Sequence, residues 1–200
     1  MLNHPILEQS FAIIDQEIGN HNLNKLEYAI ARRVIHATAD FDFINLLTFS
    51  PHAISNGINS LQNKTPIITD VTMVKQGINT LVKKTFNNPV IAAVEQVATP
   101  LPGKTRTETG LLKCFQQYPE AIYVIGNAPT ALLALCQEIS KVKIKPSLII
   151  GVPVGFVSVV ESKQILAQID VPQIRVEGRK GGSAVASSIL NALLVLAWDS

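Results

Sequence analysis

Residues 121–139, with the sequence AIYVIGNAPTALLALCQEI, join two kinds of apolar pattern across a short turn. Residues 121–125 form an apolar run of the length typical of a buried strand, whereas residues 130–139 have an apolar spacing that suits a helix. Between them, Gly126 to Thr130 contains small and turn-forming residues, which let backbone approach a ligand before a helix begins. The stretch therefore predicts a strand, a tight turn and a helix.

The same alternation extends in both directions along the chain. Several of the apolar runs are apolar on both sides, as expected of strands that helices cover on two faces. We predict strands at residues 46–49, 66–70, 90–94, 121–125, 147–150 and 172–176, and helices at 5–18, 24–37, 51–61, 71–81, 107–117, 130–139, 159–168 and 183–196. This pattern predicts an α/β protein, a three-layer α/β/α sandwich with a mainly parallel sheet. We expect one domain over residues 1–200, in which the N-terminal helices within 5–37 pack on the α/β body.

The composition narrows the class of protein. Apolar residues make up 47% of the 200 residues and charged residues 16%, which is typical of a folded chain. A net charge of +2 with few aromatic residues argues against a nucleic-acid partner. The most apolar run, residues 148–160, is short and interrupted by glycine and proline, so we expect no membrane span. Without a signal-peptide pattern, and with Cys114 and Cys136 far apart, the chain is expected to be cytoplasmic with reduced thiols.

Arg32, Arg33 and His36 are the first candidates for a chemical role. On a helix they lie three and four residues apart and can share one face. Arginine binds carboxylates with two hydrogen bonds, and histidine can give and take a proton near neutral pH. The alternative interpretation is a solvated cationic face with an incidental histidine. Asp40 could orient the imidazole if the helix continues that far.

In parallel sheets, ligands bind beyond the carboxyl ends of the strands, so the junctions after the predicted strands are the next candidates. Gly178 to Ser183 places Arg179, Lys180 and three glycines directly before a helix, where free backbone N–H groups and two cations would hold an anion. A flexible basic loop is the alternative interpretation. No Gly-rich nucleotide fingerprint, nucleophile elbow or zinc spacing occurs, so the residues favour a cofactor-free pocket lined by cations.

Several blocks of sequence, in the same order along nearly the whole chain, closely resemble the precorrin-8X methylmutases, a family that includes the cobalt-precorrin-8 methylmutases. The blocks are Ser10-Phe11, Arg32 to Thr38, Asp70 to Val74, Ile125 to Leu132, Gly151 to Val157 with Glu161-Ser162-Lys163, and Gly178 to Ser183. One departure is Ala39, where the family motif commonly has glycine. Another is the segment from Val97 to Gly103, which contains two prolines.

The resemblance implies an isomerase of cobalamin biosynthesis that moves a methyl group from C-11 to C-12 of the macrocycle. The product would be hydrogenobyrinic acid, or cobyrinic acid where the ring holds cobalt. The resemblance also implies a homodimer without a cofactor or a metal site, a corrinoid substrate, and no nucleic-acid or membrane partner. It places the catalytic histidine at His36 and substrate contacts at Ser10, Arg33 and Arg106. Further cations and junction residues suited to a flat ring edged with carboxylates are Arg32, Asn127, Arg179 and Lys180.

Two other functions fit parts of the pattern. A non-catalytic corrinoid carrier would use the same pocket and would not need His36. A nucleotide-dependent enzyme could use the loop at residues 178–183 for phosphate, although the fingerprint after the first strand is missing. Only the methylmutase interpretation explains all the blocks together.

Overall fold

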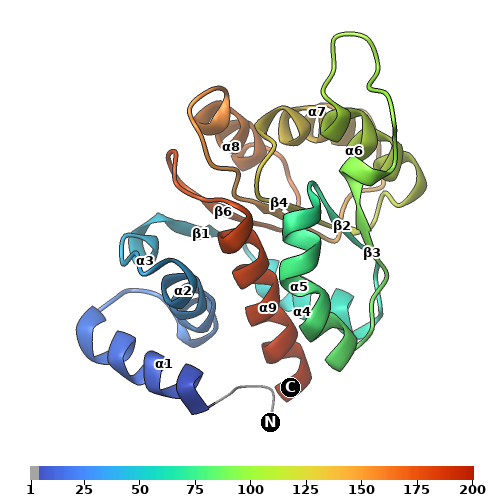
Figure 1. The fold of residues 1–200 in the computed structure, drawn as a ribbon. Helices are drawn as coiled ribbons and strands as arrows, with labels where there is room; N and C mark the ends of the chain where they lie inside the picture. Colours follow the sequence, from blue (N-terminus) through green and yellow to red (C-terminus); the bar gives the residue numbers. More distant parts are fainter. Residues whose placement is uncertain (1–4) are drawn as a thin grey trace.

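Six strands form one sheet in the computed structural model, which describes residues 5–200 (Figure 1). Their order across the sheet is β1–β6–β5–β4–β2–β3. Neighbouring strands are parallel, except that β1 pairs with β6 in the antiparallel direction. The strands are β1 (Leu47–Phe49), β2 (Ile67–Thr69), β3 (Val90–Ala92), β4 (Ile122–Ile125), β5 (Leu148–Gly151) and β6 (Gln173–Val176).

Helices cover both faces of this sheet (Figure 1). On one face, α9 (Ser183–Asp199) packs against α2 (Lys25–Thr38), α4 (Ala53–Gln62) and α5 (Thr72–Lys84). On the other face, α7 (Pro129–Ile139) packs between α6 (Arg106–Gln117) and α8 (Val159–Ala167). Helix α1 (Pro5–Ile18) packs on α2 at the outside of the first layer.

The central strands β4 and β5 are almost entirely apolar because both faces of the sheet are buried there, whereas β6 also contains Gln173 and Arg175. In β4, Ile122 and Val124 belong to the core beneath α9, whereas Tyr123 and Ile125 belong to the core beneath α6, α7 and α8. This alternation follows from the two-residue period of a strand. The predicted α/β/α sandwich with a mainly parallel sheet is confirmed.

Three details differ from the sequence-based expectation. The short helix α3 (Phe43–Leu46) was not predicted, because four residues are too few to show a helical period. The strand predicted at residues 90–94 ends at Ala92, and the chain continues as the 3-10 helix η1 (Ala93–Glu95). Leu26 lies four residues before the buried Ile30, a spacing that predicts the same buried face of α2, but it is 41% exposed because it lies in the first turn of that helix.

The end of α2 determines the direction of the chain beyond His36. The helix starts with a capping box, in which Asn24 Oδ1 accepts the N–H of Glu27 and the Glu27 carboxylate accepts the N–H of Asn24. It ends at Ala39, which adopts the left-handed conformation with φ 52° and donates its N–H to the Ile35 carbonyl. Asp40 therefore leaves the helix axis, and its carboxylate accepts a hydrogen bond from Lys180. The expectation that Asp40 orients the imidazole along a continuing helix is wrong.

Ala39→Gly is expected to stabilise the protein, because glycine adopts the left-handed conformation without steric cost. The gain is offset in part by the greater freedom of glycine in the unfolded chain. We expect an increase of about 0.5–1 kcal/mol in the free energy of unfolding, measured by urea denaturation. The control is Ala37→Gly, in the regular part of the same helix, and it should lower the free energy of unfolding by about the amount that Ala39→Gly raises it. A destabilised Ala39→Gly variant would contradict this account of the helix end.

Candidate active site

The carboxyl ends of the parallel strands form one edge of the sheet, and the strand order reverses there between β2 and β4. From β2 the chain moves outward to β3, whereas from β4 it continues in the other direction to β5 and β6. Such a reversal leaves a crevice where ligands of α/β proteins bind. Asp70 follows β2, and Asn127 lies two residues after β4.

Asp70 ties the two sides of this reversal together. Its side chain is fully buried, and Oδ2 accepts the backbone N–H groups of Asn127 at 2.6 Å and Ala128 at 2.9 Å. Its Oδ1 accepts the N–H of Val71 at 2.9 Å. Burial raises the pKa of the Asp70 carboxyl, and the backbone N–H groups oppose that rise. Asp70 thereby fixes the turn that carries Asn127, whose side chain remains exposed.

The loop at residues 178–183 lies at the same edge, between β6 and α9. The Lys180 ammonium is bonded to Asp40 at 2.7 Å and to Asp42 at 2.5 Å, and these carboxylates raise the pKa of Lys180. These bonds attach the loop to the segment that follows α2, the helix of His36. The Arg179 guanidinium instead lies 5.7 Å from the ring centroid of Phe156, in the loop after β5. Lys180 is therefore already paired with carboxylates, whereas Arg179 is exposed.

His36 lies exposed in the last turn of α2, and the Phe11 ring of α1 meets it edge-on at 5.9 Å between centroids. Arg33, one turn earlier, is half-buried, and its guanidinium lies 5.9 Å from the same ring. Burial lowers the pKa of Arg33, while the nearby Glu8 carboxylate raises it. Phe11 thus contacts both Arg33 and His36, and all three belong to one side of the α1–α2 pair.

Arg32 and Ser10 have local structural contacts on the same pair of helices. Arg32 Nη1 binds Asp15 of α1 at 2.7 Å, and its guanidinium lies 4.3 Å from the centroid of the Phe11 ring. The Tyr28 hydroxyl donates to the other Asp15 oxygen at 2.5 Å. Ser10 Oγ donates to the Ile6 carbonyl at 3.0 Å, one turn back in its own helix. Arg32 therefore braces α1 against α2.

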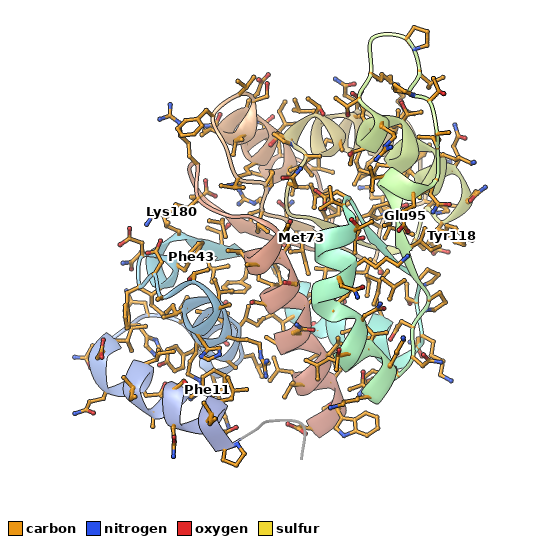
Figure 2. All side chains as sticks on the ribbon, viewed as in Figure 1. Phe11, Phe43, Met73, Glu95, Tyr118 and Lys180 are labelled. Carbon is orange, nitrogen blue, oxygen red and sulfur yellow. The ribbon has the colours of Figure 1, made fainter. Side chains whose placement is uncertain are left out.

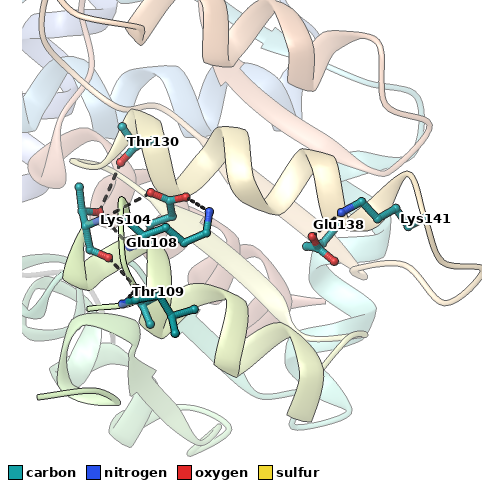
Figure 3. A network of polar contacts seen from close by, with 8 residues as sticks. Lys104, Glu108, Thr109, Thr130, Glu138 and Lys141 are labelled. Carbon is teal, nitrogen blue, oxygen red and sulfur yellow. Dashed lines mark hydrogen bonds and ion pairs between the residues drawn. The ribbon is translucent and has the colours of Figure 1, made fainter. Parts of the chain in front are cut away.

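Arg106 begins α6 on the other side of the reversal. It lines a hollow of about 490 Å³ together with Val71, Thr72, Val94, Glu95, Val97 and Ala98. Figure 3 shows how the start of α6 is fixed: Lys104 pairs with Glu108, and the Thr105 hydroxyl accepts the Glu108 N–H and approaches Thr130 of α7. The loop before α6 is held by the Leu101 N–H, which donates to Thr109 Oγ1 at 3.0 Å. These contacts fix the first turn of α6, from which Arg106 lines the hollow.

Large apolar side chains are exposed along this edge. Met73 at the start of α5 is 71% exposed, and Figure 2 shows it beside the first turns of α9. Phe156 and Val157, after β5, are 85% and 82% exposed. By contrast, the apolar hollow of about 480 Å³ around Phe115 lies between the far ends of α6 and α7, and no arginine or histidine lines it. The carboxyl edge thus combines exposed apolar surface with Arg106 and Arg179.

Two residues with structural importance for this site were not singled out by their chemistry in the sequence. Lys163 of α8 is 1% exposed and donates to the carbonyls of Gly178 at 2.9 Å and Lys180 at 2.7 Å. Burial lowers the pKa of Lys163 to about 8, which Glu177 opposes. Asp70 appeared only at the start of the block from Asp70 to Val74. Lys163 stands among the polar residues Glu161, Ser162 and Gln164, so the local sequence of α8 gave no signal that this lysine is buried.

Residues 5–200 contain neither a metal-binding cluster nor a membrane-spanning helix. No cluster of three or more histidine, cysteine, aspartate or glutamate side chains in that range has the arrangement of a metal site. None of the helices described there is both long enough and apolar enough to span a bilayer.

The α/β sandwich thus carries arginines and exposed apolar side chains at the carboxyl edge of its sheet, and an exposed histidine near the end of α2, whose following segment is bonded to the loop at 178–183. The family model described as CbiC, precorrin-8X methylmutase, matches residues 5–196. The chain belongs to this precorrin-8X methylmutase family. It is therefore an isomerase of cobalamin biosynthesis.

Individual relatives agree with this assignment. A cobalt-precorrin-8 methylmutase of Synechocystis is 58% identical over 98% of this chain and 97% of its own length. A cobalt-precorrin-8 methylmutase of Leptospira interrogans is 40% identical over 98% of this chain and 94% of its own length. The crystal structure of the precorrin-8X methylmutase of Thermus thermophilus superposes with a TM-score of 0.89 at 40% identity, covering 98% of both chains.

Proposed function

We propose that the substrate of this isomerase is cobalt-precorrin-8, which it converts to cobyrinic acid by moving the C-11 methyl group to C-12. The observation that supports the cobalt form is the 58% identity, over nearly the full length, with the Synechocystis protein named cobalt-precorrin-8 methylmutase. We propose that the enzyme works in the cytoplasm as a homodimer of single-domain chains. Exposed Ile6 and Ile13 on α1, and Leu26 on α2, offer apolar surface for a second copy.

In this proposal the ring lies along the carboxyl edge of the sheet. Its carboxylates pair with Arg33, Arg106 and Arg179, because guanidinium groups hold carboxylates through paired hydrogen bonds. Met73, Phe156 and Val157 supply the apolar surface that the ring faces require. Ser10 of α1 and Asn127 after β4 contribute further polar contacts to the ring. Arg32 and Lys180 act indirectly, since their ion pairs with Asp15, Asp40 and Asp42 hold α1, α2 and the loop at 178–183 in place.

His36 supplies the proton that the rearrangement needs. Protonation of the conjugated ring polarises its π-system, and the bond from C-11 to the methyl group then breaks as the bond from C-12 forms. The ring afterwards returns the proton to the imidazole, so no redox partner is consumed. Fixing the ring geometry lowers the barrier further. Phe11 supports the imidazole from α1 through the edge-on ring contact.

Anaerobic incubation of the purified protein with cobalt-precorrin-8, and separately with metal-free precorrin-8X, tests the proposal. The expected result with the cobalt substrate is a changed absorption spectrum at unchanged mass, at a higher kcat/KM than with the metal-free ring. Faster conversion of the metal-free ring would overturn the proposed substrate. Binding of both rings without a spectral change would instead favour a corrinoid carrier.

A further inference from the structure

Lys163 is a buried cation whose environment differs from that of an ordinary structural lysine. It is 1% exposed, yet none of the ion pairs found within residues 5–200 includes it. Its hydrogen-bond acceptors are two backbone carbonyls, of Gly178 and Lys180. Burying an ammonium group without a carboxylate costs free energy, so a protein has reason to keep one only where its charge or its donors serve a purpose.

The two bonds from Lys163 fix the orientation of the peptide groups in the loop at 178–183. In a trans peptide the N–H points opposite to the C=O of the preceding residue. Since the carbonyls of Gly178 and Lys180 point inward to the lysine, the N–H groups of Arg179 and Gly181 point away from it. The Arg179 carbonyl accepts the Gly155 N–H at 3.3 Å, which orients the N–H of Lys180 away from that neighbour.

Three successive backbone N–H groups, those of Arg179, Lys180 and Gly181, are thereby left available. None of them donates a hydrogen bond within the part of the chain that the structure describes. Successive backbone N–H groups without partners can bind an anion, and the peptide geometry places those of Arg179 and Gly181 on the side of the chain away from Lys163. Arg179 adds an exposed guanidinium beside them, whereas the Lys180 side chain is turned toward Asp40 and Asp42.

The loop path is further restricted by Gly181. It has φ +149°, and a Cβ at this position would lie 2.2 Å from the Val152 carbonyl oxygen. The next residue, Gly182, donates its N–H to that same oxygen at 2.9 Å. The loop is therefore held from one side by the strand β5 junction and from the other by Lys163.

We propose that Lys163 is a positioning residue: it holds the carbonyls of the 178–183 loop inward so that the backbone N–H groups of residues 179–181 bind a carboxylate of the corrinoid ring. The inference rests on the proposed function, in which this edge binds the ring. It assigns the carboxylate to backbone donors and Arg179, and gives the Lys180 side chain a structural role. The buried charge of Lys163 also makes the loop more attractive to an anion.

The test is the affinity of Lys163→Met for cobyrinic acid, compared with that for the same ring after its carboxylates are converted to amides. Both affinities are measured by absorption titration. We expect the variant to bind the acid at least about tenfold more weakly than the unmodified protein, because charge-assisted hydrogen bonds are lost. Binding of the amide should change much less, and turnover should show a raised KM with kcat largely retained. Lys145→Met, which removes a lysine bonded to the Asp170 carbonyl at 2.8 Å, is the matched control.

An equal loss for the acid and the amide would mean that Lys163 has a merely structural role, and would overturn the proposal. Should Lys163→Met fail to fold, amide hydrogen exchange on the unmodified protein decides instead. Cobyrinic acid should slow exchange at residues 179–181 and the amide should not; no difference between the two ligands would overturn the proposal. Turnover of cobalt-precorrin-8 by the unmodified protein tests the proposed function separately from either outcome.

Discussion

His36→Ala is expected to lower kcat by about 10²–10⁴-fold, the range that a positioned proton donor typically contributes. The imidazole is exposed and makes only an edge-on ring contact with Phe11, so its removal leaves no buried polar group without a partner. Alanine also favours the helical conformation more than histidine does. The variant should therefore fold normally and keep its affinity for the corrinoid within a few-fold. Single-turnover absorption measurements under anaerobic conditions, with circular dichroism as the folding check, provide the test.

Two further variants separate proton transfer from packing at His36. His36→Asn keeps a polar side chain that cannot deliver a proton at neutral pH, and it should be as inactive as the alanine variant. His21→Ala removes a histidine that stacks on Tyr28 at 4.1 Å between centroids, and its kcat should match that of the unmodified protein. If His36→Ala retains kcat within about threefold, another group moves the proton and His36 has only a binding role.

The fold was predictable because its elements follow local apolar periods. The run at residues 121–125 became β4 and the helical spacing after it became α7, since neither depends on distant residues. The antiparallel direction of β1 was not visible, because it depends on how α3 returns the chain to the edge beside β6. The four residues of α3 show no period of their own.

The candidate site was less predictable, because its essential contacts join residues far apart in sequence. Lys180 was expected to face the ligand as a free cation, but its partners Asp40 and Asp42 lie about 140 residues earlier, and only the folded chain brings them together. The same holds for Lys163, whose burial depends on the path of the loop at 178–183. The roles of His36, Arg33 and Arg106 stay predictions, and the His36 substitutions described above test the first of them.

Asp70→Ala is expected to cause the largest loss of stability among these variants. The substitution removes the acceptor of three backbone N–H groups, on Val71, Asn127 and Ala128, at a fully buried position. Leaving such donors without partners costs about 1–3 kcal/mol each where water cannot reach them. We expect the free energy of unfolding to fall by about 3–5 kcal/mol and Tm by about 6–20 °C, from the usual scaling for chains of this size. Calorimetry and urea denaturation measure both quantities.

Asp70→Asn distinguishes the role of the acceptors from that of the volume. If the asparagine oxygen faces the turn at Asn127, it can still accept the N–H groups of Asn127 and Ala128. The amide nitrogen then faces the N–H of Val71, and because both groups are donors, no hydrogen bond forms there. The Asp70→Asn variant should lose about half as much stability as Asp70→Ala. The control is Asp170→Ala, at a fully exposed carboxylate, which should change the free energy of unfolding by less than about 0.5 kcal/mol. Because the turn also positions Asn127, kcat/KM should fall along with stability in the two Asp70 variants. An Asp70→Ala protein as stable as the unmodified one would show that water replaces the carboxylate, and that the two sides of the strand reversal are held together by packing alone.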